Sequence, residues 1–311
     1  MPFARLLVVC SALFAGSAFA QLQDLEEQFR ATQIRTEKLA ENLYVLFGVG
    51  GNIIASLGDD GVLFVDDQFP QMASKYKAAI GELGGGKIDF VINTHWHFDH
   101  ANGNQTLGPE GTRIIAHENS RAMLTKNNVI NLVTRTVDQP AFPAAALPVV
   151  TYDRDMRMHF NGERIDLLHF GPAHTTGDTA VVFRGHNVVH LGDVYNTAGY
   201  PFIDAGNGGS LNGVIEFCEK VLEAIDDTYV VVPGHGPIAR YDDLVDYVAM
   251  LTTIRDRVKA LMSSGATLQQ VIAAQPTSEW DDKRGDPAAF LNRAYTSLSA
   301  GGMARQVQGG R

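Results

Sequence analysis

The chain after its first 40 residues alternates between short apolar runs and polar, glycine-rich turns. Three runs have the length of strands, and they occupy residues 43–47, 52–57 and 62–65. A helix is expected next over residues 71–83, because three consecutive glycines follow it and can end it. The apolar run that begins at Ile88 then predicts a further strand, which leads directly into a stretch rich in histidine.

A second series of strands is expected after about residue 150. Its members are residues 156–160, 165–169, 179–184, 187–191 and 229–232. A strand at residues 113–116, a helix near Ser120 and a helix over residues 211–225 complete this pattern. Residues 127–148 contain three prolines and little periodicity. They predict an irregular excursion near the mouth of a site, either a loop that covers the substrate or a plain surface loop.

The last part of the chain has the periodicity of helices. Apolar residues recur at helical spacing from Leu244 to Leu261, and residues 267–274 and 287–298 predict two more helices. Residues 299–311 are expected to be frayed. We therefore expect one main domain over residues 21–240, which begins with a polar lead-in, and C-terminal helices over residues 241–311 that pack on the same domain.

The first 20 residues have the features of a secretory signal peptide. Arg5 precedes an apolar run over residues 6–14, and Ala18-Phe19-Ala20 forms a small-x-small cleavage site. Cleavage after Ala20 would leave a periplasmic or secreted protein with no stable membrane anchor. The alternative is an uncleaved anchor, for which the apolar run is short.

Composition narrows the classes of protein. The chain has 311 residues, is 45% hydrophobic and 19% charged, and has a formal net charge of -10 without a basic patch. These values predict a globular protein and argue against nucleic acid or an anionic membrane surface as its main partner. The expected partner is a small-molecule substrate. Cleavage of the signal would leave Cys218 alone, so that no disulfide forms within the mature chain; its helical context favours a small core residue over a nucleophile. The oligomeric state is left open.

The histidine-rich stretch at the end of the strand from Ile88 carries the strongest chemical signal. It reads His95-Trp96-His97-Phe98-Asp99-His100. In an extended segment alternate residues point to the same side, so His95 and His97 can bind one ion. As the chain turns, Asp99 and His100 can reach a second point nearby. Imidazole and carboxylate are the usual protein ligands of zinc and related ions.

Three further loops follow strands, and they contain His174, Asp193 and His235. The sequence His-x-His-x-Asp-His, the segment Gly171 to Asp178 and the pairs Gly192-Asp193 and Gly234-His235 together resemble the metallo-β-lactamase superfamily, from about Leu43 to Pro237. The resemblance implies an α+β fold, a four-layer αββα sandwich with a metal site along one edge of its two sheets. The C-terminal helices would then be an extension.

The resemblance also implies which residues bind metal. His95, His97 and His174 would bind one ion, and Asp99, His100 and His235 the other. Asp193 would bridge the two. Many β-lactamases of the superfamily have cysteine at this last position and one subgroup has serine, so aspartate favours hydrolases of other substrates.

Further residues are candidates for roles around the ions. Asp99 could also orient the attacking hydroxide or shuttle a proton. Asp66 resembles a superfamily aspartate near the metal loop, and His190 lies in the core or supports the ligands from behind. The loop after Asp193 contains Tyr195, Tyr200 and Phe202, which either line the substrate pocket or pack the loop down.

These observations predict a binuclear hydrolase that uses a metal-bridging hydroxide on an ester, thioester, lactone or amide (lactam) bond. The expected cofactors are two divalent ions, zinc by default, with iron or manganese as alternatives. Rival interpretations are a periplasmic β-lactamase, an iron-dependent redox or sulfur-handling enzyme on the same fold, and a binding or scaffold protein that keeps metals for structure.

Overall fold

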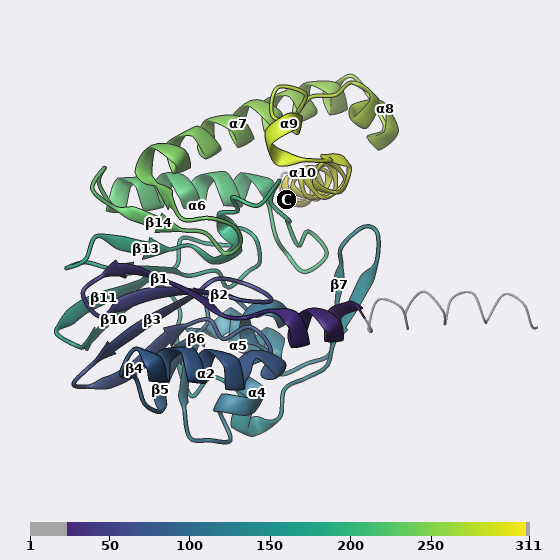
Figure 1. Ribbon diagram of the computed structural model, residues 1–311. Coiled ribbons are helices and arrows are strands. Elements are labelled where there is room, and N and C mark those ends of the chain that lie inside the picture. The colour runs from purple at the N-terminus through teal and green to yellow at the C-terminus, as the bar shows by residue number, and fades with distance from the viewer. Residues whose placement is uncertain (1–23, 309–311) are drawn as a thin grey trace, which may run out of the picture.

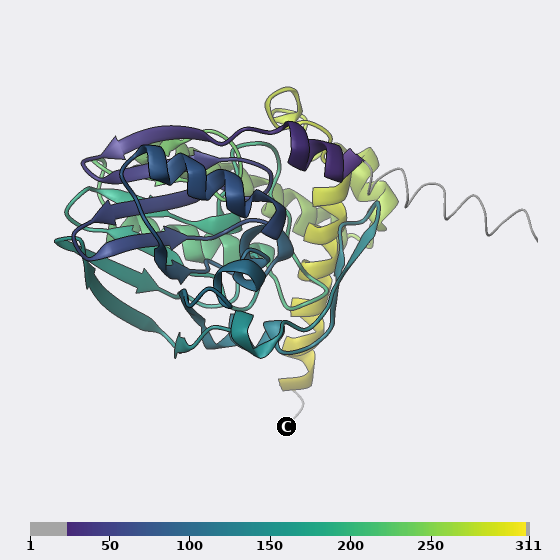
Figure 2. The same cartoon turned by 60° about the horizontal axis from the view of Figure 1, so that its bottom comes forward.

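The computed structural model describes residues 24–308. Figure 1 shows two sheets stacked face to face, with helices covering the outer face of each. Figure 2 shows the same layers from another side, with the last helix running along one end of the sandwich. The predicted four-layer αββα fold of the α+β class, with its C-terminal helices, is therefore confirmed.

The first sheet has seven strands in the order β1-β2-β3-β4-β5-β6-β9. The bounds of these strands are β1 Arg35–Ala40, β2 Leu43–Phe47, β3 Ile53–Gly58, β4 Gly61–Val65, β5 Ile88–Ile92, β6 Arg113–His117 and β9 Val150–Tyr152. The pairs from β1 to β4 are antiparallel, and the pairs from β4 through β5 and β6 to β9 are parallel. The carboxyl ends of β4 and β5 therefore lie at the same edge of the sheet.

The second sheet has six strands in the order β10-β11-β12-β13-β14-β15. The bounds are β10 Asp155–Phe160, β11 Glu163–Leu168, β12 Ala180–Phe183, β13 Val188–His190, β14 Val230–Val232 and β15 Ala239–Arg240. β13 and β14 are parallel and the other neighbours are antiparallel. β13 and β14 thus also end at a common edge.

The centre of the molecule is the layer between the sheets. Val45 and Leu63 from the first sheet meet Leu167 and Val181 from the second, and all four are fully buried. Strands with apolar residues on both faces, such as β4 and β12, are buried on both sides because helices cover the outer face. This packing holds the two sheet edges in a fixed relation.

Helices cover the outer faces. A helix over residues 24–31, the 3-10 turn η1 (Pro70–Met72) and α2 (Ala73–Glu82) pack on the first sheet. The second sheet is covered by α6 (Leu211–Ala224), α7 (Tyr241–Ser263), α8 (Leu268–Ala273), α9 (Asp281–Arg284) and α10 (Ala288–Gln308). The remaining short helices are α3 Phe98–Ala101, α4 Asn104–Leu107, α5 Glu118–Leu124, η2 Ala144–Ala146 and η3 Gly192–Val194.

The C-terminal helices share one hydrophobic cluster with the second sheet. Tyr247 of α7 and Leu291 of α10 are fully buried in the cluster that contains Val189 of β13. Cys218 of α6 lies in the same cluster, and burial raises the pKa of its thiol far above the usual range. The helices after residue 240 therefore pack on the same hydrophobic cluster as the sandwich, and the cysteine is a core residue.

Several sequence expectations need correction. Residues 127–148 are not irregular throughout, because β7 (Asn128–Asn131) and β8 (Thr136–Gln139) form a separate antiparallel hairpin. Buried Asn128 and Gln139 break the usual alternation of apolar and polar residues, which hides this hairpin in the sequence. The helix α10 continues beyond residue 298, where fraying was expected. The lead-in, expected to be extended or helical, contains both a helix and β1.

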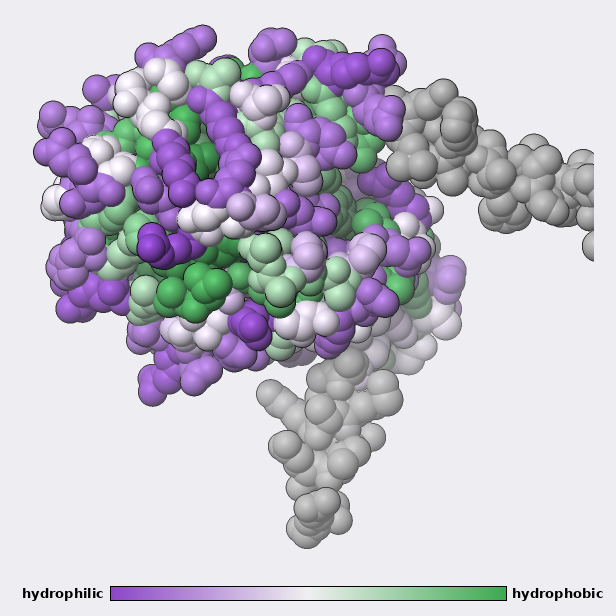
Figure 3. Space-filling view, turned by 90° about the horizontal axis from the view of Figure 1, so that it is seen from below, coloured by the Kyte–Doolittle hydropathy of each residue, from purple (hydrophilic) through white to green (hydrophobic). Residues whose placement is uncertain are grey.

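The predicted signal peptide, residues 1–20, lies outside the described residues. Within residues 24–308, no helix combines the length and apolar character needed to cross a membrane. Figure 3, which views the face carrying α2 and α4, shows hydrophilic side chains around the rim with hydrophobic residues between them.

Candidate metal centre

The two sheets bring the predicted ligands together at one edge. His95 and His97 follow β5, and Asp99 and His100 lie in α3 immediately after them. The second sheet supplies the other three: His174 lies between β11 and β12, Asp193 lies in η3 after β13, and His235 follows β14. Parallel pairing of β4 with β5 and of β13 with β14 is what directs these loops to the same side.

The seven side chains form overlapping groups with metal-binding geometry. The ligand atoms within each group lie within 4.8 Å of one another. The groups are His95, His97 and His174; His95, His100 and Asp193; and Asp99, His100 and His235. The first and last contain the residues that the resemblance assigns to one ion each, and Asp193 belongs to the group between them.

The position of Asp193 suits a bridge between two ions. Its Oδ1 lies 3.0 Å from Nε2 of His100 and 3.4 Å from Nε2 of His235. Its Oδ2 lies 3.8 Å from Nε2 of His174. The two carboxylate oxygens therefore face ligands of different ions.

The chemistry of the donor set fits cations. Within the described part of the chain, the buried Nε2 of His95 has no hydrogen-bond partner. Nε2 of His174 lies 2.8 Å from Nδ1 of His97, and Nε2 of His100 lies 3.1 Å from Nε2 of His235. Imidazole nitrogens that converge in this way, beside an aspartate, form the usual environment of a zinc-like ion.

The electrostatics of the centre agree with this fit. Burial lowers the pKa of His95 and His174, with neighbouring imidazoles acting in the same direction, so both rings are neutral as metal binding requires. On the other side, burial opposes charge, but the carboxylates of Asp193 and Asp99 raise the pKa of His235 to about 10. The carboxylates thus make the local potential negative, and a bound divalent ion would neutralise it.

Asp66 contacts the candidate ligand His100 from the side away from His235. It is fully buried at the end of β4, and its Oδ2 lies 2.7 Å from Nδ1 of His100. The same carboxylate accepts hydrogen bonds from the backbone amide and the hydroxyl of Thr94, at 2.7 and 2.8 Å. A hydrogen bond to Nδ1 leaves Nε2 of His100 free to bind an ion.

Asp204 holds the ring of His97 in the same way, and this role could not be predicted from the sequence. Its buried Oδ2 lies 3.0 Å from Nε2 of His97, which directs Nδ1 of that ring toward His174. Asn207 donates hydrogen bonds to both of its oxygens. No spacing rule links residues 97 and 204, although a lone aspartate in a glycine-rich loop after Asp193 could have been singled out.

Asn52 and His190 hold the loop that carries His235. The side-chain amide of Asn52 donates to the carbonyls of Pro233 and Gly236, both at 2.9 Å. His190 is buried, with Nε2 2.9 Å from the carbonyl of Asn52, and its Nδ1 accepts from the amide of Gly192 at 3.0 Å. His190 therefore acts on the backbone around the ligands and does not reach the ions.

Two glycines permit close packing at the centre. A Cβ atom at Gly234 would overlap Oδ1 of Asp193, and a Cβ atom at Gly51 would overlap the ring of His100. Any larger residue at either position would displace a ligand.

The predicted pocket residues do not lie together. Phe202 is close to the centre, with its ring centroid 6.0 Å from that of His97 and its carbonyl 2.7 Å from Nδ1 of His174. Tyr195 is instead buried in the core against Tyr247, at 4.9 Å between ring centroids. Tyr200 stacks on Phe290 and donates a hydrogen bond to Asp281, so it anchors its loop to the C-terminal helices.

A pocket of about 350 Å³ opens over the metal centre. His97, Asp99, Asp193 and His235 line its floor. Its walls come from Phe69, Phe98, Phe202 and the β7–β8 hairpin, among others. The ligands can therefore be reached by a small molecule from outside.

Comparison with known proteins gives the class. The family model of the metallo-beta-lactamase superfamily matches residues 60–244, more than half of the chain. The chain belongs to this superfamily, and with its overlapping His and Asp clusters it is a metal-dependent hydrolase of that class.

Individual characterised and uncharacterised relatives match only part of the chain. The chain is 28% identical over 147 residues to the 2,4-dinitroanisole O-demethylase subunit alpha of Nocardioides sp., over 46% of this chain and 41% of that subunit. It is 30% identical over 162 residues to an uncharacterized protein of Mycobacterium tuberculosis, over 47% of this chain and 68% of that protein. The chain thus spans less than half the length of the demethylase subunit.

Solved structures share the fold. A metallo-beta-lactamase from Pontibacter korlensis has a TM-score of 0.58 at 15% identity, over 71% of this chain and 99% of that one. The sec-alkylsulfatase Pisa1 from Pseudomonas sp. has a TM-score of 0.65 at 15% identity, over 84% of this chain and 50% of that one. At these identities the likeness concerns the architecture.

Proposed function

We propose that the protein hydrolyses an ester, thioester, lactone or amide-type bond of a small molecule at a binuclear metal centre. The observation that carries this proposal is the convergence of seven His and Asp side chains, four of which line the floor of an open pocket. Bound divalent ions would supply Lewis acidity and lower the pKa of a water ligand from 15.7 toward about 7.

Different residues of the chain would bind each ion and assist the reaction. His95, His97 and His174 would hold one ion, and His100 and His235 the other, together with Asp99. Asp193, whose two oxygens face the two sides, would set the separation of the ions. Asp99 is partly exposed at the pocket floor, 3.2 Å from Nε2 of His235, so it is also placed to accept a proton from a reacting group.

Asp193 favours an acyl or related hydrolase over a dedicated β-lactamase. A β-lactamase stays an alternative because proteins of that name share the fold, but they do so at low identity. The demethylase subunit and the alkylsulfatase widen the range of bonds that deserve testing. An iron-dependent redox or sulfur-handling activity is the further alternative, supported by the all-His/Asp ligand set.

The proposed cofactor is a pair of zinc ions, because imidazole and carboxylate ligands suit zinc. Iron and manganese are the alternatives. The proposed location is the periplasm or the cell exterior, on the evidence of the signal-like residues 1–20. The proposed partner is a small-molecule substrate, and nucleic acid is not expected at a chain of net charge -10.

The test is a substrate panel combined with metal analysis. The purified protein, loaded in turn with zinc, manganese and iron(II), would be assayed on a lactone, a thioester, an aryl ester, an alkyl sulfate, an aryl methyl ether and a penicillin. We expect metal-dependent cleavage of at least one acyl bond and loss of both metal and turnover in His97→Ala. Full turnover by a folded, metal-depleted His97→Ala protein would refute the proposal.

A further inference from the structure

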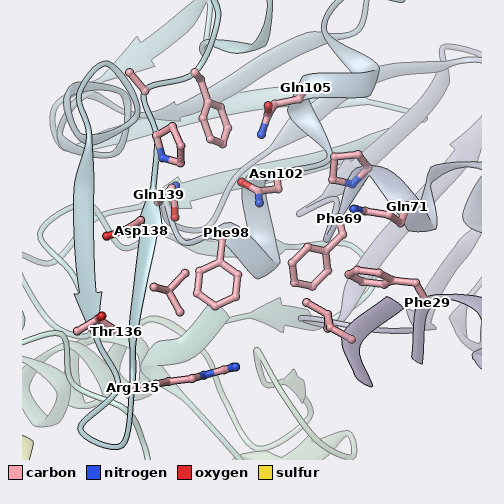
Figure 4. Close-up of a pocket in the computed structure, with 16 residues that line it drawn as sticks. Phe29, Phe69, Gln71, Phe98, Asn102, Gln105, Arg135, Thr136, Asp138 and Gln139 are labelled. Carbon is pink, nitrogen blue, oxygen red and sulfur yellow. The ribbon is translucent and has the colours of Figure 1, made fainter. Parts of the chain in front are cut away.

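A second, larger cavity of about 590 Å³ lies beside the metal-facing pocket. It is enclosed by the helix over residues 24–31, the segment around η1, helices α3 and α4, and the strand β8. Figure 4 shows Phe29, Phe69 and Phe98 converging on one side of this cavity, with the β8 residues opposite them. We call it the aromatic cavity, after these three residues.

The aromatic cavity and the metal-facing pocket share part of their lining. Leu25, Phe69, Phe98 and Arg135 belong to both. Phe98 lies in the sequence between His97 and Asp99, which are candidate ligands of different ions. A molecule bound across Phe98 would therefore have one end at the metals and the other in the cavity.

The walls of the aromatic cavity are built into the fold. Phe29 packs on Phe69 at 5.0 Å between ring centroids, and Phe69 packs on Phe98 at 6.0 Å. On the opposite wall, Gln139 donates a hydrogen bond to the carbonyl of Trp96, which ties β8 to the metal-binding loop. Such a preformed space costs little to order when a ligand enters.

The lining of the aromatic cavity is mostly apolar and includes several polar side chains. Phe29, Phe69 and Phe142 present aromatic rings, and Asn102, Gln105 and Arg135 are among the polar residues. Figure 4 shows Asn102 near the middle of the lining and Arg135 at one end. Arg135 is exposed and forms no ion pair with any residue in the described part of the chain. Its guanidinium stands where the two pockets join, so it can receive a carbonyl or carboxylate oxygen there.

We propose that the aromatic cavity binds an apolar arm of the substrate, an aliphatic chain or aryl group, while the scissile bond lies at the metal centre. The inference rests on the proposed function and names its substrate class: an amphiphilic molecule with an acyl-type bond near an extended apolar group. The occupant follows from the continuity of the lining and from the volume, which is in the range of small-molecule sites.

Two exposed positions allow the cavity to be filled without disturbing the core. Ala141 lines it after β8, and Gln105 lines it from α4. Ala141→Phe and Gln105→Trp would each take up space in it from a different element. Ala144→Phe is the matched control, because Ala144 is equally exposed nearby and does not line the cavity.

The first readout is the ratio of kcat/KM for p-nitrophenyl octanoate to that for p-nitrophenyl acetate, with the metal-loaded protein. In the unmodified protein this ratio should be greater than one. Each methylene of the octanoyl chain that is fully buried should raise the ratio by a factor of up to about four. Both filling variants should lower the ratio by about tenfold or more, and Ala144→Phe should leave it as it was. A ratio that is the same in all four proteins would overturn the proposal.

The second readout is binding of decanoate by calorimetry, which needs no turnover. Weakening by both filling variants, and not by the control, would support the cavity even if no ester were cleaved, in which case only the proposed function would fail. Equal decanoate binding by all four proteins would refute the proposal for the aromatic cavity. The proposed hydrolase function would not be affected by that result.

Discussion

Oδ2 of Asp204 lies 3.0 Å from Nε2 of His97, although the two residues are 107 positions apart in the chain. Asp204 therefore fixes the orientation of a ligand from a different loop. We predict that Asp204→Asn weakens binding of one ion by about tenfold or more, because carboxylates behind histidine ligands contribute on that scale. Competition with a chromophoric chelator would measure this.

The matched control for Asp204 is Asp59→Asn, which removes the same charge from an exposed turn. Metal affinity should be unchanged in that variant. If Asp204→Asn binds both ions as tightly as the control does, then His97 does not depend on this carboxylate.

Asn52 should matter for stability as well as for the second ion. Asn52→Ala would leave the carbonyls of Pro233 and Gly236 without their side-chain partner, at a cost of about 1–3 kcal/mol in the free energy of unfolding. The loop that carries His235 would loosen, so one ion should be released more easily. Urea unfolding and metal stoichiometry measure the two effects, with exposed Gln269→Ala as the control. Equal unfolding of the two variants would contradict this role.

Metal removal should lower the melting temperature. Ions that bind the folded chain and not the unfolded chain stabilise it by about 4 kcal/mol at a thousandfold excess over Kd, which corresponds to a Tm shift on the order of 10 °C. We therefore expect chelation to lower Tm and zinc to restore it. The shift should be smaller in His97→Ala and unaltered in His159→Ala, whose imidazole is exposed on β10. A Tm indifferent to metal would count against a buried binuclear centre.

The ion pairs of Asp166, which lie away from the metal centre, should make the free energy of unfolding depend on pH in the acid range. Burial raises the pKa of its carboxyl, but hydrogen bonds from Arg164, Arg184 and Arg157 outweigh burial and hold the pKa well below its usual range. This stabilisation is complete above about pH 4, the pKa of an unfolded aspartate, and is lost as the pH falls toward the folded value. The partly exposed arginines limit its size.

The measurement for Asp166 is urea unfolding of the metal-free protein and of Asp166→Asn at pH 7 and at pH 3. The difference in the free energy of unfolding between the two proteins should be larger at pH 7. A difference that stays constant or grows toward pH 3 would show that the three arginines do not depress the folded pKa.

Much of the fold could be predicted from the sequence because its strands are short and bounded by glycine. β2, for example, has the predicted bounds of residues 43–47, β3 is shifted by one residue, and β4 begins one residue earlier than predicted. The hairpin β7–β8 was missed because Asn128 and Gln139 are buried by hydrogen bonds and not by apolar contact. Periodicity alone does not reveal such a strand.

The candidate ligands could be placed together because each follows a strand, and the ends of parallel strands meet. The residues that hold the ligands were harder to find. Asp204 acts through a hydrogen bond to His97, and Asn52 acts through two to the loop that carries His235; these long-range contacts have no signature in the local sequence. Tyr195 and Tyr200 lie close in sequence to Asp193, yet their rings turn toward the helices after residue 240.

The ligands are divided between the two sheets, and His100 and His235 meet although 135 positions separate them. Neither half of the chain carries a complete set for two ions. Loading of both ions would therefore come late in folding, after the long-range docking of the sheets. A nascent or truncated chain that ends before β13 would carry His95, His97 and His174, but it would lack Asp193 and also Asp204 and Phe202, which hold the rings of His97 and His174.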